Sequence, residues 1–182
     1  MANCKIRAVA LPYMRELRTK LKETIDLSVL YDNKRVCIER QDGVYEVKAT
    51  DIPGKPSLLH ASASGKLFFA YMAEEQRDKL IDEMNLVRYT SNTITNRQEL
   101  RQQLEKIRTQ GFSCSYEELT EMVNAVAAPI RDRSGEVIAS LSIWGLVTHF
   151  SRDKMNECTA LIISAAKRIS VELGYRDESS GL

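Results

Sequence analysis

The stretch LLHASASGKLFFAYM, residues 58–72, places a group of very small side chains directly before a strongly apolar run. The apolar run predicts a buried helix, and the small residues mark its start. Small side chains let elements pack closely or let the backbone approach a ligand. At a helix start, unpaired N–H groups and the helix dipole also attract a carboxylate or phosphate. The stretch therefore predicts either tight packing with an N-capping serine or a cradle for an anion.

A second informative stretch is VIASLSIW, residues 137–144, which is predicted to be a strand. Side chains alternate between the two faces of a strand, so one face is plain core. Its members are Val137, Ala139, Leu141 and Ile143. The other face mixes hydroxyls with large apolar groups and suits the wall of a small-molecule pocket. Its members are Ile138, Ser140, Ser142 and Trp144.

The remaining pattern predicts an α+β fold with an antiparallel sheet, because strands come as hairpins and helices come in separate blocks. A helix is expected from Ile6 to Lys22, with Pro12 as a kink or in the first turn. A hairpin follows over residues 24–40, with Ile25, Leu27 and Val29 on one face and the turn at Asn33 and Lys34. A short strand is expected at 44–49 and a loop at 51–57.

The second half of the chain is read in the same way. A helix is predicted at 73–84 and irregular chain at 85–94, and Thr95 with Gln98 has capping-box spacing before the next helix. That helix has Leu100, Leu104 and Ile107 inside and ends at Gly111. Strands are predicted at 122–131 and 136–144. Small Ala125 and Ala127 lie on one side of the first, and Pro129 marks an edge or a strand end. Ser151 is expected to cap a helix that reaches about Gly174.

Composition excludes several classes of protein. The 26 basic and 25 acidic residues give a net charge of +1, so this chain offers no basic stripe for nucleic acid. The four cysteines are scattered, which predicts free thiols and neither a disulfide framework nor a metal site. No apolar run is long enough for a membrane span, and no secretory signal is recognisable, so a cytoplasmic location is expected.

Catalytic motifs are missing as well. SGK at 64–66 is no P-loop, because the required glycine and the following Ser or Thr are absent. His60 and His149 stand at no recognisable spacing from an acid. We expect no enzyme, no cofactor and no catalytic residue. Two alternatives stay open: an esterase-like enzyme using Ser62 or Ser64 near His60, or a ligand-free oligomerisation module.

Several ordered motifs together resemble the effector-binding domain of the IclR family of bacterial transcription regulators. They are ALPYMRELRTKLKETIDLSVL (10–30), LLHASASGK (58–66), IRTQGFSCSYEELTE (107–121) and VAAPIRDRSGEVIASLSIWG (126–145), before a long amphipathic helix. The resemblance implies a GAF-like or profilin-like sheet of about six antiparallel strands flanked by helices. It also implies a small-molecule effector, dimers or tetramers, and DNA contact only through a winged helix-turn-helix domain that this chain lacks. Residues 1–22 would be the entry helix, 23–175 the sensor domain and 176–182 a disordered tail.

The resemblance also implies a ligand site, carried over position by position. The small-residue loop gives Ser62, Ala63, Ser64 and Gly65, and the last strand gives Ser142 and Trp144. Ser115 stands where the family often has an acid, Ala125 where a cysteine is common, and Met122 where a glycine is usual. These departures remove polar partners and fill space. They favour a longer or more apolar carboxylate stacked on Trp144 over a small keto acid.

Overall fold

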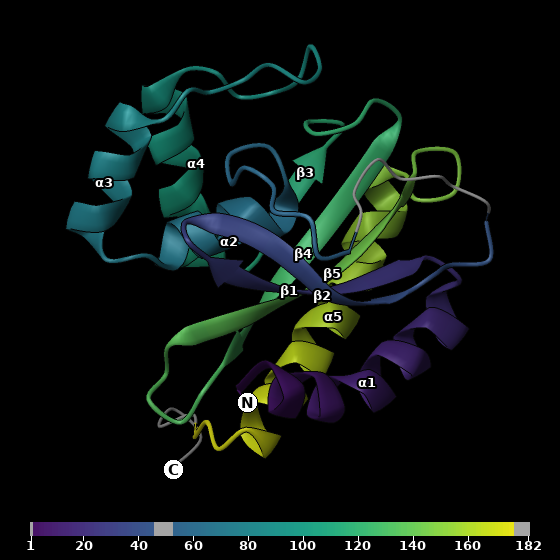
Figure 1. Cartoon of the computed structure of the whole chain (residues 1–182). Coiled ribbons are helices and arrows are strands. Elements are labelled where there is room, and N and C mark those ends of the chain that lie inside the picture. The colour runs from purple at the N-terminus through teal and green to yellow at the C-terminus, as the bar shows by residue number, and fades with distance from the viewer. Residues whose placement is uncertain (1, 46–52, 177–182) are drawn as a thin grey trace.

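Five strands form an antiparallel sheet in the order β2-β1-β5-β4-β3 in the computed structural model, which describes residues 2–45 and 53–176 (Figure 1). An isolated antiparallel bridge between Arg35 and Ser57 adds one further pairing at the outer side of β2. The predicted α+β class is confirmed, and five strands come close to the six expected. The strands are β1 (Thr24–Tyr31), β2 (Lys34–Gln41), β3 (Ser113–Tyr116), β4 (Val123–Arg131) and β5 (Val137–Leu146).

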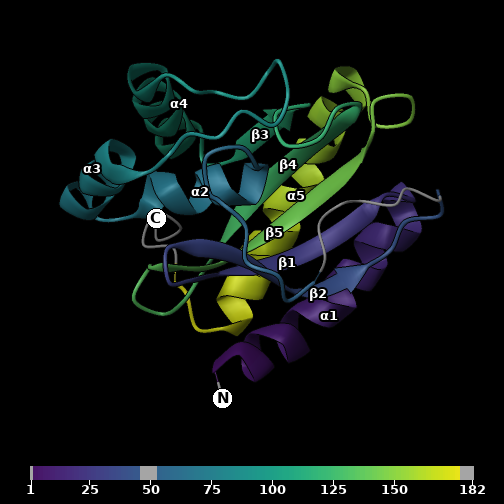
Figure 2. The same ribbon diagram turned by 45° about the horizontal axis from the view of Figure 1, so that its top comes forward.

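Helices cover both faces of this sheet. The two long helices, α1 (Ala2–Leu21) and α5 (Arg152–Glu172), pack on one face and on each other. The short helix α2 (Ala63–Tyr71) crosses the opposite face, and α4 (Arg97–Gln110) packs on α2 with α3 (Glu74–Glu83) nearby (Figure 2). Each face has its own apolar core, so the sheet is an interior layer.

The face toward α1 and α5 is apolar, as alternation predicts. Ile25, Leu27 and Val29 of β1 lie in one buried cluster with Leu141 and Ile143 of β5. Burying such side chains stabilises the fold by about 1.5–3 kcal/mol each. The polar residues of the same two strands therefore point to the α2 face, where the predicted site lies.

One residue was assigned to the wrong face. Ile138 was expected beside Ser140 and Ser142, but it packs against the α1 and α5 cluster. The register of β4 with β5 shifts here, because Ile130 pairs with Ala139 while Arg131 pairs with Val137. A bulge of one residue breaks the strict alternation of side chains between the two faces. Counting every second residue back from Trp144 therefore assigns the wrong face to the residues before Ala139.

The first hairpin forms as predicted, with its turn one residue earlier. Asp32 and Asn33 have φ of 48° and 52°, the left-handed pair that a two-residue hairpin turn requires. The strand expected at 44–49 is not seen in its described part, where Val44 and Tyr45 form a bend. Its remainder, part of the loop at 51–57 and most of the tail at 176–182 lie outside the described residues.

Helix ends mostly follow the predicted chemistry. Ser151 caps α5, and Gly111 closes α4 with a φ of 81°. The cap of α4, however, is Asn96, whose side chain accepts from the Glu99 N–H, and not Thr95. Pro12 lies well inside α1 and not in its first turn, because the helix starts at Ala2.

The strand β3 was not predicted. Its four residues pair with β4 only from Asn124 to Ala127. At Pro129 the outer side of β4 therefore has no strand partner among the described residues, which agrees with the expected edge position.

Candidate functional site

The start of α2 is built as an N-capped, tightly packed turn. The Ser62 hydroxyl accepts a hydrogen bond from the Gly65 N–H at 3.0 Å. A Cβ on Gly65 would overlap the Leu59 carbonyl oxygen, so glycine is needed for a close approach of backbone to backbone. Ala63 and Ser64 are buried against the sheet. The packing interpretation of this stretch is therefore confirmed, while a role in anion binding stays a prediction.

The other four predicted site residues lie on the sheet face that α2 covers. Ser115, Ala125 and Trp144 stand in register across β3, β4 and β5. Ser142 lies in the next row, between Ala127 of β4 and Asp26 of β1. Residues far apart in sequence thus come together on one surface.

Two hydrogen bonds join this surface to the turn before α2. The Ser140 hydroxyl donates to the Ser64 hydroxyl at 3.0 Å, and the Ser115 hydroxyl donates to the Ala61 carbonyl at 3.2 Å. The small-residue turn and the hydroxyl-bearing strands are therefore in direct contact. A ligand that binds between them must exchange some of these contacts.

Trp144 belongs to a polar cluster that sequence reasoning missed. Its indole N–H donates to Asp26 at 3.0 Å, and Arg40 binds both oxygens of Asp26 at 2.7 Å each. The Arg40 guanidinium also lies 5.2 Å from the centre of the Trp144 ring. The available signal was an acid, Asp26, between the apolar Ile25 and Leu27, while its pairing with Arg40 depends on a bulge in the β1–β2 pairing.

Arg35, a buried arginine of β2, fixes the loop before α2. Arg35 donates from Nε to the Ser57 hydroxyl at 3.0 Å and from Nη1 to the Ser28 hydroxyl at 3.1 Å. The backbones of Arg35 and Ser57 also exchange two hydrogen bonds. The α2 face of β1 and β2 is therefore polar throughout its middle, in contrast to the apolar face below α1 and α5.

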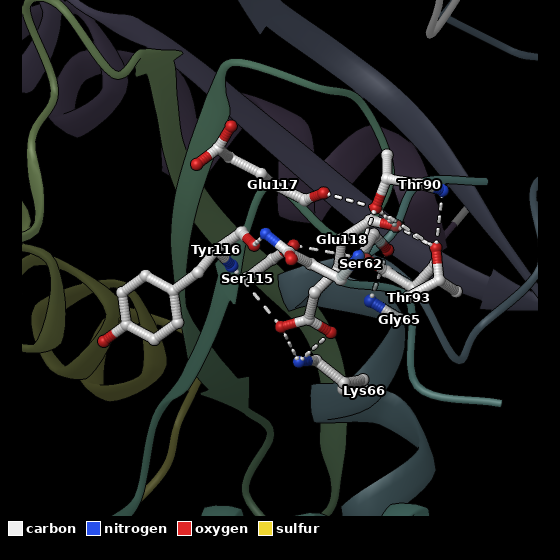
Figure 3. Close-up of polar contacts among 11 residues, drawn as sticks. Ser62, Gly65, Lys66, Thr90, Thr93, Ser115, Tyr116, Glu117 and Glu118 are labelled. Atoms are coloured by element: carbon white, nitrogen blue, oxygen red, sulfur yellow. Dashed lines mark hydrogen bonds and ion pairs between the residues drawn. The ribbon is translucent and has the colours of Figure 1, made fainter. Parts of the chain in front are cut away.

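Beside the turn, α2 carries a buried ion pair. Lys66 is fully buried, and its Nζ lies 2.6 and 2.5 Å from the two carboxylate oxygens of Glu118 (Figure 3). Burial lowers the pKa of Lys66 and raises the pKa of Glu118, and each partner opposes the shift of the other. Each partner therefore favours the charged form of the other against the effect of burial.

The loop that carries Glu118 is held by two threonines. The Thr90 hydroxyl donates to the Glu117 carbonyl and the Thr93 hydroxyl to the Glu118 carbonyl, both at 2.7 Å (Figure 3). The turn before α2, the loop after β3 and the segment between α3 and α4 therefore form one connected unit.

Met122, before β4, has a φ of 61°. This left-handed conformation costs a residue with a Cβ about 1–2 kcal/mol. We expect Met122→Gly to raise the free energy of unfolding by about 0.5–1 kcal/mol, since the exposed side chain contributes little burial. Urea unfolding measures this change in the free energy of unfolding. Met122→Ala, which keeps a Cβ at the left-handed position, is the matched control. Equal stability of the two variants would contradict the argument.

His60 and His149 form no catalytic pair with Ser62 or Ser64. His60 is buried, and its Nε2 donates to the Val87 carbonyl at 2.8 Å, while its Nδ1 has no hydrogen-bond partner among the described residues. Burial lowers the pKa of His60. Ser62 and Ser64 bond to Gly65 and Ser140 instead. His149 stacks on Tyr45 at 3.9 Å. These contacts form no Ser–His nucleophile pair.

Within residues 2–45 and 53–176, no group of His, Cys, Asp and Glu side chains is placed to hold a metal ion. None of the helices in this part of the chain is long and apolar enough to cross a membrane. The four cysteines are free, and Cys4 alone among them is exposed.

Comparison with known proteins identifies what this arrangement resembles. Residues 1–171 match the family described as bacterial transcriptional regulator IclR, C-terminal. The regulator KdgR of Dickeya chrysanthemi is 35% identical over 164 residues, which cover 90% of this chain and 54% of that protein. The chain thus spans about half the length of this relative.

Solved structures agree with the sequence match. The crystal structure of the C-terminal domain of Escherichia coli KdgR has a TM-score of 0.84 and 32% identity, covering 94% of this chain and 99% of that one. An IclR homologue from Microbacterium hydrocarbonoxydans, complexed with 4-hydroxybenzoate, has a TM-score of 0.87 and 25% identity. The match covers 95% of this chain and 70% of that one.

Proposed function

Since this chain belongs to the IclR family of bacterial transcriptional regulators, we propose that it is the effector-sensing domain of a DNA-binding regulator. A small organic acid or aromatic metabolite binds between the start of α2 and the sheet. DNA binding is assigned to a winged helix-turn-helix domain outside residues 1–182, and a cytoplasmic location is part of the proposal.

The polar α2 face of the sheet is the observation that carries this proposal. Asp26, Ser28, Ser140 and Ser142 are all buried there. Buried polar groups cost free energy unless they are hydrogen-bonded, and the equivalent positions on the other face are apolar. A layer of hydroxyls beside an arginine and an indole suits recognition of a polar ligand better than it suits packing alone.

The class of ligand follows from the residues around α2. The helix start and the hydroxyls of Ser64 and Ser142 favour a carboxylate. Ala125 and Trp144 offer apolar surface where the family more often has polar groups, which favours an aromatic or longer aliphatic acid. The homologue that binds 4-hydroxybenzoate supports an aromatic acid as the first candidate.

Sensing requires that the ligand change the arrangement of subunits. A ligand does so only by its different affinity for two states of the protein. Ser64 and Lys66 lie in the same turn of α2, and Lys66 binds Glu118. Displacement of the turn therefore acts on the loop after β3 and on the segment from Thr90 to Thr93. In a dimer or tetramer this movement would reposition the paired DNA-binding domains.

The two alternatives lead to different expectations. The relatives are named as regulators, and the hydroxyls of Ser62 and Ser64 are hydrogen-bonded to Gly65 and Ser140, so an esterase is disfavoured. A ligand-free oligomerisation module would show no shift in melting temperature with any metabolite, together with clear self-association.

We expect 4-hydroxybenzoate and phenylacetate to change the fluorescence of Trp144, the one tryptophan of the chain, in a saturable way. Ser142→Ala should weaken binding about tenfold, because a hydrogen bond to a charged group is lost. Isothermal calorimetry measures the affinity independently of the fluorophore.

The matched control is Ser134→Ala, on the exposed turn between β4 and β5, which should bind as the wild type does. A response to two- and three-carbon acids alone would refute the preference for aromatic acids. Equal affinities of Ser142→Ala and the wild type would remove Ser142 from the site.

A further inference from the structure

A cavity of about 530 Å³ opens beside the loop that leads into α2. This volume is in the range of small-molecule sites. None of the eight predicted site residues is among the described residues that line this cavity. The described residues that line it are Lys34, Lys55, Pro56, Ser57, Leu58, Tyr89 and Leu119.

One wall of the cavity is fixed to the sheet. Ser57 pairs with Arg35 through N–H to carbonyl bonds of 3.0 and 2.9 Å, and the Arg35 guanidinium holds the Ser57 hydroxyl. Arg35 is itself buried and reaches Ser28 of β1. The position of Ser57 and its neighbour Leu58 is therefore set by the strands.

The opposite wall is fixed by the threonine contacts. The Tyr89 N–H donates to the Thr93 hydroxyl at 3.0 Å, and that hydroxyl donates to the carbonyl of Glu118, the residue before Leu119. Figure 3 shows Thr90 and Thr93 beside the loop of Glu117 and Glu118. The Tyr89 ring also packs on His60 at 5.8 Å. Both walls are thus held in place without a ligand.

The lining combines two charges of one sign with apolar surface. Lys34 and Lys55 are exposed at the rim, and none of the described lining residues is acidic. Pro56, Leu58 and Leu119 supply apolar contact, and the Tyr89 ring adds an aromatic face. Partial burial raises the pKa of Tyr89, so its phenol stays neutral and does not repel an anion.

We propose that this cavity is a separate binding site for an organic anion with a flat or bulky apolar body. The anionic group lies between the ammonium groups of Lys34 and Lys55. The apolar body lies between Leu58, Leu119 and the Tyr89 ring. The site stands apart from the proposed effector site on the sheet, so either can exist without the other.

The test uses 2-naphthoate and its neutral amide, 2-naphthamide, as probes in isothermal calorimetry. Wild-type protein should bind the carboxylate more tightly than the amide. Lys34→Gln/Lys55→Gln should weaken 2-naphthoate about fivefold and leave 2-naphthamide unchanged, since two exposed charge contacts are lost. Lys106→Gln, at an exposed position on α4, is the matched control and should behave as the wild type.

A variant that fills the cavity tests its apolar part. Leu119 is half-buried in a loop, so Leu119→Trp should fold and should abolish the component of binding of both probes that belongs to this cavity. Unchanged binding in Leu119→Trp, or equal losses for acid and amide in the double lysine variant, would overturn the proposal. If 2-naphthoate binding were lost in Ser142→Ala but kept in the double lysine variant, the probe would bind at the sheet instead. That result would leave the proposed function standing and the present inference wrong.

Discussion

Lys66→Met is expected to lower the free energy of unfolding by about 3–5 kcal/mol, the range for breaking a buried ion pair by removing one partner. The substitution leaves the Glu118 carboxylate buried beside an apolar side chain. The Glu118 carboxylate then keeps only a long hydrogen bond from the Tyr116 N–H, at 3.4 Å, among the described residues. Urea unfolding followed by far-UV circular dichroism measures the loss, with the slope of the transition as the test of two-state behaviour.

Two further variants separate the charge from the shape of the side chain. Lys66→Met/Glu118→Leu removes both charges and should recover most of the loss, because an apolar pair of similar volume often replaces a buried ion pair without cost. Lys79→Met is the control for an exposed pair, since Lys79 lies 4.0 Å from Glu83 at the surface of α3. Its expected effect is below about 0.5 kcal/mol. A loss in Lys66→Met no larger than in Lys79→Met would show that the buried pair does not stabilise the loop.

Local patterns were sufficient for the elements that carry their own signals. The stripe of Leu100, Leu104 and Ile107 and the glycine at 111 specify α4 and its end, and the structure confirms both. The turn of residues 132–136 specifies the β4–β5 hairpin in the same way. In each case the determining residues lie within a few positions of one another.

Local patterns failed where a distant element decides. The sequence of β3 is short and mostly polar and does not itself predict a strand. Ser113–Tyr116 is a strand because it pairs with the edge of β4. Ile138 changes face because of a bulge that no periodicity shows. At the start of α4, Thr95 and Asn96 are both suitable N-cap residues. The Thr95 hydroxyl accepts a hydrogen bond from Arg88, and Asn96 is the cap.

The site shows the same division. Alternation in β5 places Ser140, Ser142 and Trp144 on one face, and the structure puts that face against α2. Grouping Ser115 and Ala125 with them needed the family resemblance, because their separation in sequence carries no local signal. The Lys66–Glu118 pair spans 52 residues and was missed for that reason. Whether the eight residues bind a ligand stays a prediction for the titrations above.

Glu23 should make stability depend on pH in the direction opposite to that of an ordinary surface carboxylate. It lies between α1 and β1, and its carboxylate occupies the space where a Cβ on Gly145 would be. Burial raises the pKa of Glu23 to about 7, and Lys154 at the start of α5 opposes the shift. The folded protein therefore binds this proton more tightly than the unfolded chain does, whose glutamates titrate near about 4.3.

The sign follows from that difference. Stability from the protonated form is complete below the unfolded pKa and is lost as the pH rises through about 7, the pKa in the folded state. We expect Glu23→Gln, which stays neutral, to be more stable than the wild type by about 2 kcal/mol at pH 8, with the difference shrinking toward pH 4.5. The full shift would give about 3 kcal/mol, and partial access of water reduces it.

Unfolding in urea at a series of pH values measures this difference, because all other titrating groups cancel between wild type and variant. Glu75→Gln, on the exposed face of α3, is the matched control and should show a difference that does not change with pH. A carbon-13 titration of the Glu23 carboxylate locates its midpoint directly. A midpoint near 4, with a constant difference between Glu23→Gln and the wild type, would mean that water reaches the carboxylate over Gly145. The α1–β1 turn would then not respond to pH.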